Sequence, residues 1–321
     1  MPSKKRRDGL ERALAQLDEA TRDPGSPEAR AAIAEALDGS SFLAARAAGI
    51  VRDERLEGWA DALCAALDRF LAGGAALDPG CHAKLAITEA LDATDAARRE
   101  PLLAAARCTQ REGAGPTSDT AAPVRARAVL ALARGDYPDL PLLAGELLAD
   151  PLPVVRRAAL RALESHGDRM GAGLAHLTMR RGDEDPLVVS KAMSALITLA
   201  PDVGVPAVAA LLHSPDATAR ELAIVALGES RRPNALDALL AAMADVVRAA
   251  ERATYFTALA LHRSEPALRA LLPWLEGSRA DAVKALEALA IRRFEPEVRE
   301  RVEQAARASG LDAELRAAFE R

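Results

Sequence analysis

The chain has 321 residues and a formal net charge of −5. Half of its residues are hydrophobic, but aromatic residues make up only 3% of the sequence. A core of Ala, Leu and Val suits helices in close contact, so this composition disfavours β-rich folds and aromatic-lined cofactor pockets. The acidic balance also argues against a surface that attracts nucleic acid as a whole.

The N-terminal region and the cysteines indicate the compartment. The basic cluster Lys4–Arg7 is interpreted as a disordered solubilising tail, with a nucleic-acid-binding arm as the alternative. No apolar segment follows it as in a secretory signal, and the longest apolar stretches are too short to span a membrane. Cys64, Cys81 and Cys108 form an odd set without CxxC spacing, which favours a reducing compartment. We therefore predict a cytoplasmic protein with no membrane segment, metal or cofactor.

Charged helices are predicted at both ends of the chain. Gly9–Thr21 and Glu28–Leu37 come first, and the unit near Phe42–Val51 that follows fits the later repeat pattern poorly. Glu297–Ala308 and Asp312–Glu320 close the chain. Charged terminal helices are typical of the caps that keep a repeat array soluble.

A short helical pattern recurs between these ends, as in VRARAVLAL at Val124–Leu132 and VRRAALRAL at Val155–Leu163. Each copy ends in a leucine, and these anchor leucines are separated by 41, 31, 33, 31, 32 and 30 residues. Small and apolar residues recur with a helical period, and alanine precedes every anchor. The pattern predicts one helix per copy. The anchors are Leu91, Leu132, Leu163, Leu196, Leu227, Leu259 and Leu289.

A second set of amphipathic segments lies between the anchor helices, so each unit reads as helix, short turn, helix. No segment has the alternation of a strand. Asp150-Pro151, Asp185-Pro186 and Ser214–Asp216 combine a capping residue with a helix breaker at predicted helix starts. The second-set helices are expected near Leu56–Leu71, Ala96–Thr109, Leu140–Leu148, Arg169–Arg181, Val203–His213, Asn234–Arg248 and Pro266–Glu276.

The pattern D-P-x-x-V-R-x-x-A-x-x-A-L, most complete at Asp150–Leu163, resembles the HEAT-repeat family and, within it, the bacterial phycobilisome-lyase HEAT-like subgroup. The resemblance is good over 120–292 and looser over 26–110. It implies an all-α fold, an α-solenoid wound as a right-handed superhelix of about eight HEAT-like helix pairs. The expected organisation is a basic tail with a capping helix over 1–25, the solenoid over 26–292 and capping helices over 293–321.

A basic column lies seven positions before the anchor leucines, at Lys84, Arg125, Arg156, Arg220 and Arg252. One interpretation is a cationic stripe that binds an acidic partner or a phosphate backbone. The other is the Asp–Arg ladder that the resemblance implies, in which each arginine pairs with an aspartate at a helix start. We favour the ladder, because the chain is acidic and has few aromatic side chains that could stack on bases.

An insertion at Gln110–Ala122 adds about ten residues between two repeats, and insertions in repeat arrays often lie on the binding face. Its Gly, Pro, Ser, Thr and Asp content predicts a surface loop. The densest polar constellation of the chain lies on or beside this loop. The candidate binding residues are Arg107, Gln110, Arg111, Glu112, Asp119, Thr120, Arg125 and Arg127.

No catalytic motif is found, so we predict a non-enzymatic protein–protein interaction scaffold or adaptor. Its partner would be a protein or peptide on the concave face or at the inserted loop. One alternative is a helical-repeat DNA-binding protein similar to the alkylpurine DNA glycosylases, but its only indoles, Trp59 and Trp274, lie in distant repeats. A chromophore lyase-like protein is a further alternative, suggested only by the name of the repeat subgroup. The partner, the process and the oligomeric state stay open.

Overall fold

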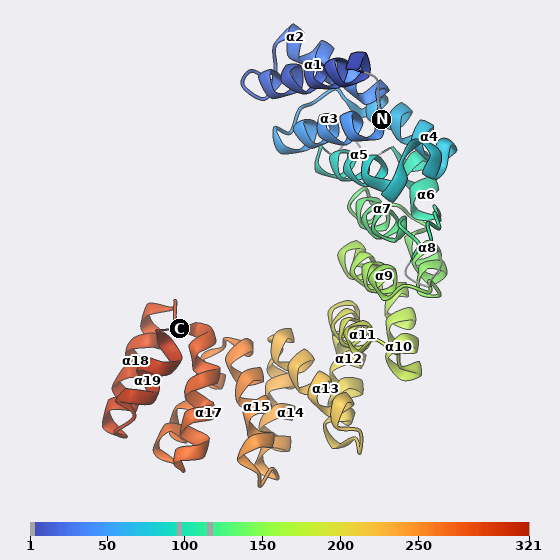
Figure 1. The fold of residues 1–321 in the computed structure, drawn as a ribbon. Helices are drawn as coiled ribbons and strands as arrows, with labels where there is room; N and C mark the ends of the chain where they lie inside the picture. The colour runs from blue at the N-terminus through green and yellow to red at the C-terminus, as the bar shows by residue number, and fades with distance from the viewer. Residues whose placement is uncertain (1–3, 95–97, 114–117, 321) are drawn as a thin grey trace. The chain divides into compact units, whose positions relative to one another are not determined.

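The computed structural model describes residues 4–94, 98–113 and 118–320, whose regular structure is helical (Figure 1). These ranges contain nineteen α-helices and several short 3-10 helices. Within them, β-type pairing is limited to one isolated bridge between Arg111 and Asp119. The all-α prediction is therefore confirmed for the described chain. None of its helices combines the length and the apolar character that crossing a bilayer requires.

The chain forms two compact units, Met1–His166 and Gly167–Arg321. The helices of the first unit are α1 (Lys4–Ala20), α2 (Pro27–Asp38), α3 (Ser41–Asp53), α4 (Ala60–Leu77), η1 (Pro79–Cys81), α5 (His82–Ala93), α6 (Arg99–Ala106), α7 (Ala122–Arg134), α8 (Leu140–Leu147) and α9 (Pro153–His166). Those of the second unit are α10 (Met170–Arg181), α11 (Pro186–Leu199), α12 (Pro201–Ala209), η3 (Ala210–His213), α13 (Ala217–Ser230), α14 (Pro233–Ala244), α15 (Ala249–His262), α16 (Glu265–Leu271), η4 (Leu272–Glu276), α17 (Arg279–Leu289), η5 (Ala290–Arg292), α18 (Pro296–Ala308) and α19 (Asp312–Phe319).

Alternate helices of the first unit pack in two rows. In one row α3 packs on α5, α5 on α7 and α7 on α9; in the other α2 packs on α4 and α4 on α6. The helix that precedes a member of the first row also packs on it, as α4 does on α5, α6 on α7 and α8 on α9 (Figure 1). The three helices α5, α7 and α9 therefore lie next to one another and present a continuous face.

The second unit repeats this scheme. Helices α11, α13, α15 and α17 pack on one another in sequence, and α12 packs on α14. The helix that precedes each member of the first row packs on it, as α10 does on α11, α14 on α15 and η4 on α17. Consecutive copies of the sequence pattern are thus consecutive neighbours within each unit.

The anchor column explains the core of both units. All seven anchor leucines are buried, and so is the alanine that precedes each of them. Small residues matter where backbones meet: a Cβ added at Gly228 of α13 would lie 2.5 Å from the carbonyl oxygen of Ala258 on α15. Because any larger side chain would separate these helices, glycine at this position permits their close contact.

Helix starts follow the predicted caps. The Asp185 carboxylate accepts the Leu187 N–H at 2.9 Å at the start of α11, and Asp216 accepts the Thr218 N–H at 2.9 Å at the start of α13. These bonds satisfy backbone donors that have no partner inside the helix. The pairing of an acidic cap with a neighbouring proline therefore marks both starts correctly.

Several boundaries differ from expectation: α4 begins at Ala60 and not Leu56, α6 spans Arg99–Ala106 and not Ala96–Thr109, and α14 ends at Ala244 and not Arg248. Helix α1 begins at Lys4, so the Lys4–Arg7 cluster is helical and not the disordered tail that its charge suggested; lysine and arginine are good helix formers. Helix α4 continues past the expected end at Leu71 to Leu77. Within it Gly74 has φ 53° and ψ −145°, a conformation open essentially to glycine alone, and it redirects the chain toward the start of α5.

Candidate functional site

The arginine column braces one helix start to the next. On α15, Arg252 Nη1 donates to two carbonyl oxygens just before the helix, both at 2.8 Å. Its Nε and Nη2 each donate to one oxygen of the Asp281 carboxylate on α17, both at 2.9 Å. Arg125 on α7 makes the same fork with Asp150, at 2.8 and 3.2 Å. Such bidentate, charge-assisted pairs fix both distance and orientation.

Two further members of the column make the backward half of this brace. Arg156 and Arg220 each donate through Nη1 to the carbonyl oxygens five and six residues earlier, at 2.6–3.2 Å. For Arg220 we find no carboxylate partner among the described residues. These contacts favour the ladder interpretation of the column over the binding stripe, because the guanidinium donors are used within the protein.

Lys84, the first member of the column, forms a buried variant of the brace. It is fully buried on α5, and its Nζ lies 3.3 Å from Oδ2 of the equally buried Asp78 and 2.8 Å from Oε1 of Gln110. Asp78 also accepts the backbone N–H groups of Ala83 and Lys84, at 3.0 and 2.9 Å, and so caps α5. Gln110 of the inserted loop takes the place that a carboxylate occupies in the later braces.

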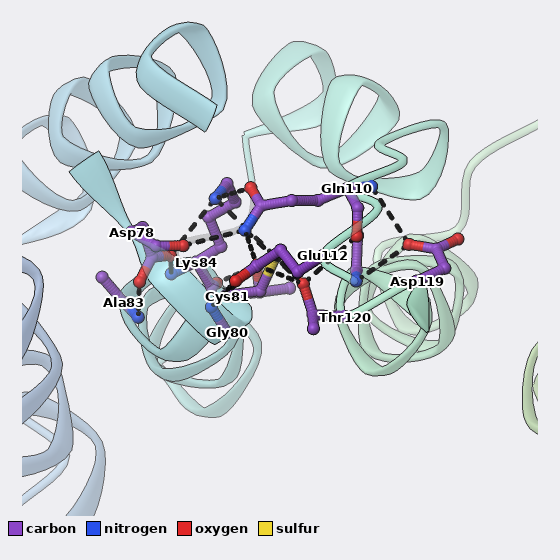
Figure 2. Close-up of polar contacts among 11 residues, drawn as sticks. Asp78, Gly80, Cys81, Ala83, Lys84, Gln110, Glu112, Asp119 and Thr120 are labelled. Atoms are coloured by element: carbon purple, nitrogen blue, oxygen red, sulfur yellow. Dashed lines mark hydrogen bonds and ion pairs between the residues drawn. The ribbon is translucent and has the colours of Figure 1, made fainter. Parts of the chain in front are cut away.

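The inserted loop folds back on this pair, as Figure 2 shows. Glu112 accepts the Gly80 N–H at 2.8 Å and the Thr120 hydroxyl at 2.7 Å, and it also accepts the Gln110 side-chain amide. The hydrogen bonds from Gln110, then Thr120 and Gly80, hold the pKa of the Glu112 carboxyl below its ordinary value. The loop is thus tied to the turn before α5 by charge-assisted bonds.

Asp119 fixes the other end of the loop. Its carboxylate accepts the N–H groups of Gln110 and Ala121, both at 3.0 Å, and lies 2.8 Å from Arg125 Nη1. Burial opposes ionisation of Asp119, but the Gln110 N–H and the Arg125 guanidinium outweigh it and lower its pKa. Because Arg125 is 2% exposed, Asp119 and Asp150 share a buried cation.

The backbone around Cys81 is strained. Cys81 has φ 57°, in the left-handed region, and follows Gly80 at φ 73°. Its Sγ lies 3.7 Å from Lys84 Nζ and 3.4 Å from Thr120 Oγ1. Burial raises the pKa of the Cys81 thiol and that of Cys108, which keeps both protonated at neutral pH, unlike a reactive thiolate. The cluster therefore holds the insertion on α5 and has no activated nucleophile.

Five of the eight candidate binding residues meet in this network: Gln110, Glu112, Asp119, Thr120 and Arg125. Their polar atoms bond mainly to one another and to the turn before α5. The two ends of the loop are less exposed than expected, since Gln110 is 6% exposed and Ala121 is fully buried; residues 114–117 of the predicted loop lie outside the described residues. The ladder interpretation had predicted internal pairing for Arg125, whereas Gln110, Glu112, Asp119 and Thr120 were expected to be available to a partner.

The other three candidates lie apart from the network. Arg107, at the end of α6, pairs with Glu146 on α8 at 3.0 and 3.1 Å. Arg127 faces α5, where it contacts Glu89 at 3.4 Å and Asp92 at 3.1 Å. The side chain of Arg111 is exposed to solvent. Arg127 also borders a concave surface.

That surface is a groove of about 540 Å³ across α5, α7 and α9. Apolar side chains line part of it, among them Leu85, Leu130 and Val154, the last of which is 40% exposed. Charged side chains line the rest: Glu89, Arg127, Arg134, Arg161 and Glu164. A concave surface that mixes apolar contact area with oriented charges is typical of a peptide-binding site.

The cations of the groove differ in their state of pairing. Arg127 and Arg134 share the carboxylate of Asp92 on α5, at 3.1 Å for Arg127 and 2.8 Å for the Nε of Arg134. Arg161 on α9 is exposed, and it has no hydrogen bond or ion pair with any residue in the described ranges. The groove therefore offers one open guanidinium beside an apolar surface.

Most groove residues were missed from the sequence. A usable signal existed, because Glu89, Leu130 and Arg161 occupy one column, two positions before their anchor leucines. Positions in one column of stacked helices fall on one face. The binding site was predicted at the insertion because polar residues are densest there, but those polar groups form hydrogen bonds with one another.

The two tryptophans that a DNA glycosylase would use to stack on bases make other contacts in this protein. Trp59 is 5% exposed, and Trp274 packs on Phe256 with ring centroids 5.1 Å apart, so neither indole is an open stacking platform. Across the described ranges, no group of three or more His, Cys, Asp or Glu side chains is arranged to hold a metal ion.

Comparison with known proteins assigns no family. No protein-family model matches the chain, and no curated protein matches it. What the chain does must therefore be inferred from its own residues.

Proposed function

We propose that the chain is a HEAT-like α-solenoid, a right-handed superhelix of about eight helix pairs, that acts as a non-enzymatic interaction scaffold. The recurrent packing of anchor helices within each unit supports the architecture. The odd set of free cysteines, Cys64, Cys81 and Cys108, supports a cytoplasmic location as part of the same proposal.

One observation carries the binding function: the groove across α5, α7 and α9 combines exposed apolar surface with the open guanidinium of Arg161. Side chains from three successive repeats contribute to it. In a stacked array such a surface is a ready docking site for an extended or helical segment of another protein.

The groove also defines the chemistry of its occupant. Leu130 and Val154 favour an aliphatic side chain, and Arg161 favours a carboxylate next to it. Glu89 and Asp92 already form ion pairs with Arg127, so we do not expect them to select a basic side chain in the partner. The proposed partner is therefore a protein segment that presents aliphatic residues beside an aspartate or glutamate.

The test is selection of a random-sequence peptide library displayed on phage against the full-length protein. We expect enriched peptides to combine aliphatic and acidic residues. Fluorescence anisotropy of the labelled peptides would then give affinities for Arg161→Glu and Val154→Asp. Each change should weaken binding at least about tenfold, the worth of one charge-assisted contact or of one well-packed side chain.

Matched controls separate the groove from the inserted loop. Arg111→Glu reverses an exposed arginine on the loop, and Leu142→Asp changes a leucine of α8 that is 69% exposed outside the groove. Both should leave peptide affinity within about twofold, as expected for changes away from the contact. Loss of binding in Arg111→Glu with retention in Arg161→Glu would refute the groove and favour the loop.

A further inference from the structure

An arginine cluster lies in the second unit, at the turns that end α13, α15 and α17. We call Arg231, Arg263 and Arg292 the arginine rim. Arg231 caps the C-terminus of α13, Arg263 caps that of α15, and Arg292 ends the 3-10 turn η5 after α17. Because α13 packs on α15 and α15 on α17, the three turns are neighbours.

The rim converges on one carboxylate, that of Glu295. Arg292 Nε and Nη2 donate to Glu295 Oε2 at 3.0 and 2.6 Å, and Arg263 Nη1 lies 3.5 Å from Oε1. The hydrogen bond from Arg292, and then the charges of Arg292, Arg263 and Arg231, lower the pKa of Glu295. The Glu295 carboxylate thus contacts two of the rim cations, Arg292 and Arg263, while Arg231 adds only to the positive potential around it.

Bonding at this site is incomplete. Arg292 is 6% exposed, yet its Nη1 is buried and has no hydrogen-bond partner in the described part of the chain. Oε1 of Glu295 is buried without a hydrogen bond as well, since Arg263 approaches it only as an ion pair. Arg231 and the rest of Arg263 are exposed to solvent. The rim therefore holds more donors than the Glu295 carboxylate uses.

We propose that the arginine rim binds the phosphate group of a phosphorylated segment of a partner protein, and that Glu295 is an internal anion which this phosphate displaces. A phosphate monoester brings three acceptor oxygens and about two negative charges at neutral pH, which match several guanidiniums better than one carboxylate does. The rim lies in the second unit and the groove in the first, so this proposal does not depend on the groove.

A phosphopeptide fits the rim better than a nucleic acid does. Arg292 and Arg263 converge on one carboxylate, whereas a nucleic acid requires cations that follow a backbone. The ring of Phe294, which is 82% exposed, has the guanidinium of Arg293 over it, with Cζ 4.6 Å from the ring centroid. Arg293 therefore already occupies one face of this ring.

The test is isothermal titration calorimetry of the full-length protein with three probes: a blocked Ala-phosphoserine-Ala peptide, its unphosphorylated form and inorganic phosphate. We expect the phosphopeptide to bind most tightly and the unphosphorylated peptide not to bind. Arg263→Gln and Arg231→Gln should each weaken binding by about tenfold, while Glu295→Gln should strengthen it several-fold by removing the competing anion.

Control variants match the charge changes elsewhere. Arg181→Gln at the end of α10 and Glu297→Gln at the start of α18 alter exposed residues away from the rim contacts and should leave affinity within about twofold. Circular dichroism shows whether each variant is folded. Arg231→Gln changes an exposed side chain, so it tests the rim without disturbing the Arg292–Glu295 pair. The proposal is overturned if wild type and Glu295→Gln both fail to bind, if the rim and control variants behave alike, or if inorganic phosphate binds as tightly as the phosphopeptide.

Discussion

Arg125 and Asp150, twenty-five residues apart in the sequence, face each other as a fork: Nε lies 2.8 Å from one carboxylate oxygen and Nη2 lies 3.2 Å from the other. The same fork joins Arg252 to Asp281, twenty-nine residues apart. Each fork ties the start of one anchor helix to the start of the next. At these two positions the basic column therefore connects neighbouring repeats.

Arg125→Ala should strongly destabilise the first unit. The change leaves the carboxylates of Asp119 and Asp150 without their buried cation, and breaking a buried ion pair costs about 3–5 kcal/mol. Arg127→Ala is the control, because its partner Asp92 keeps Arg134; it should cost about 0–1 kcal/mol. Urea dependence of hydrogen exchange in α7 and α9 measures both. Equal effects of the two changes would contradict the brace.

Gly228→Ala should destabilise the second unit by about 1–3 kcal/mol, because the new methyl group would collide with the backbone of Ala258 and force α13 from α15. Gly173→Ala is the matched control: nothing lies within 4 Å of its added Cβ, and alanine is a better helix former, so stability should stay equal or rise. Urea denaturation followed by circular dichroism gives both values. A neutral Gly228→Ala would show that these helices can separate freely.

Asp281→Asn should make stability less dependent on acid. The hydrogen bonds of Arg252 hold the pKa of Asp281 below its ordinary value, with Ser278 adding to the effect. Because the pKa of Asp281 is lower in the folded protein than its value of about 4 in the unfolded chain, the ionised carboxylate stabilises the folded state at pH values above about 4. This stabilisation is lost as the pH falls through the folded-state pKa. Urea midpoints of wild type and variant should therefore differ at pH 7 and converge below about pH 4. A difference that is constant with pH would count against this pairing.

Lys84→Met should lower the stability of the first unit by about 3–5 kcal/mol, because Asp78 would remain as a buried charge without its ammonium partner. Asp78→Asn should cost a similar amount, because it leaves the buried Lys84 ammonium without its carboxylate and because one amide oxygen cannot replace the two oxygens that accept the Ala83 and Lys84 N–H groups. A double-mutant cycle by urea denaturation should show a double variant that is less destabilised than the sum of its parts. Strict additivity would mean that the two groups do not interact.

The fold was largely predictable because its signal is local and repeated. Helical period, alanine before each leucine and acidic caps such as Asp185 and Asp216 each depend on a few adjacent residues. The end of α4 was not predictable in this way. Its last residues follow a kink at Gly74, whose non-helical φ and ψ no hydrophobic pattern specifies.

The site was less predictable because its contacts are distant in sequence. Gln110 contacts Lys84, twenty-six residues earlier in the sequence, and that contact buries a residue that was expected to be exposed. Polar density marked Glu112 and Thr120 correctly as neighbours but could not show that they satisfy each other. The groove depends on three helices, and only a comparison of equivalent columns would have placed Arg161 in it.

The most direct test of the central claim is methyl nuclear magnetic resonance of the full-length protein titrated with a selected peptide that has aliphatic and acidic residues. If the groove is the docking site, the methyl signals of Leu85, Leu130 and Val154 shift in a saturable manner while those of Leu142 and Leu187 stay in place. Saturable shifts confined to methyl groups outside the groove, with Leu85, Leu130 and Val154 unchanged, would contradict the account.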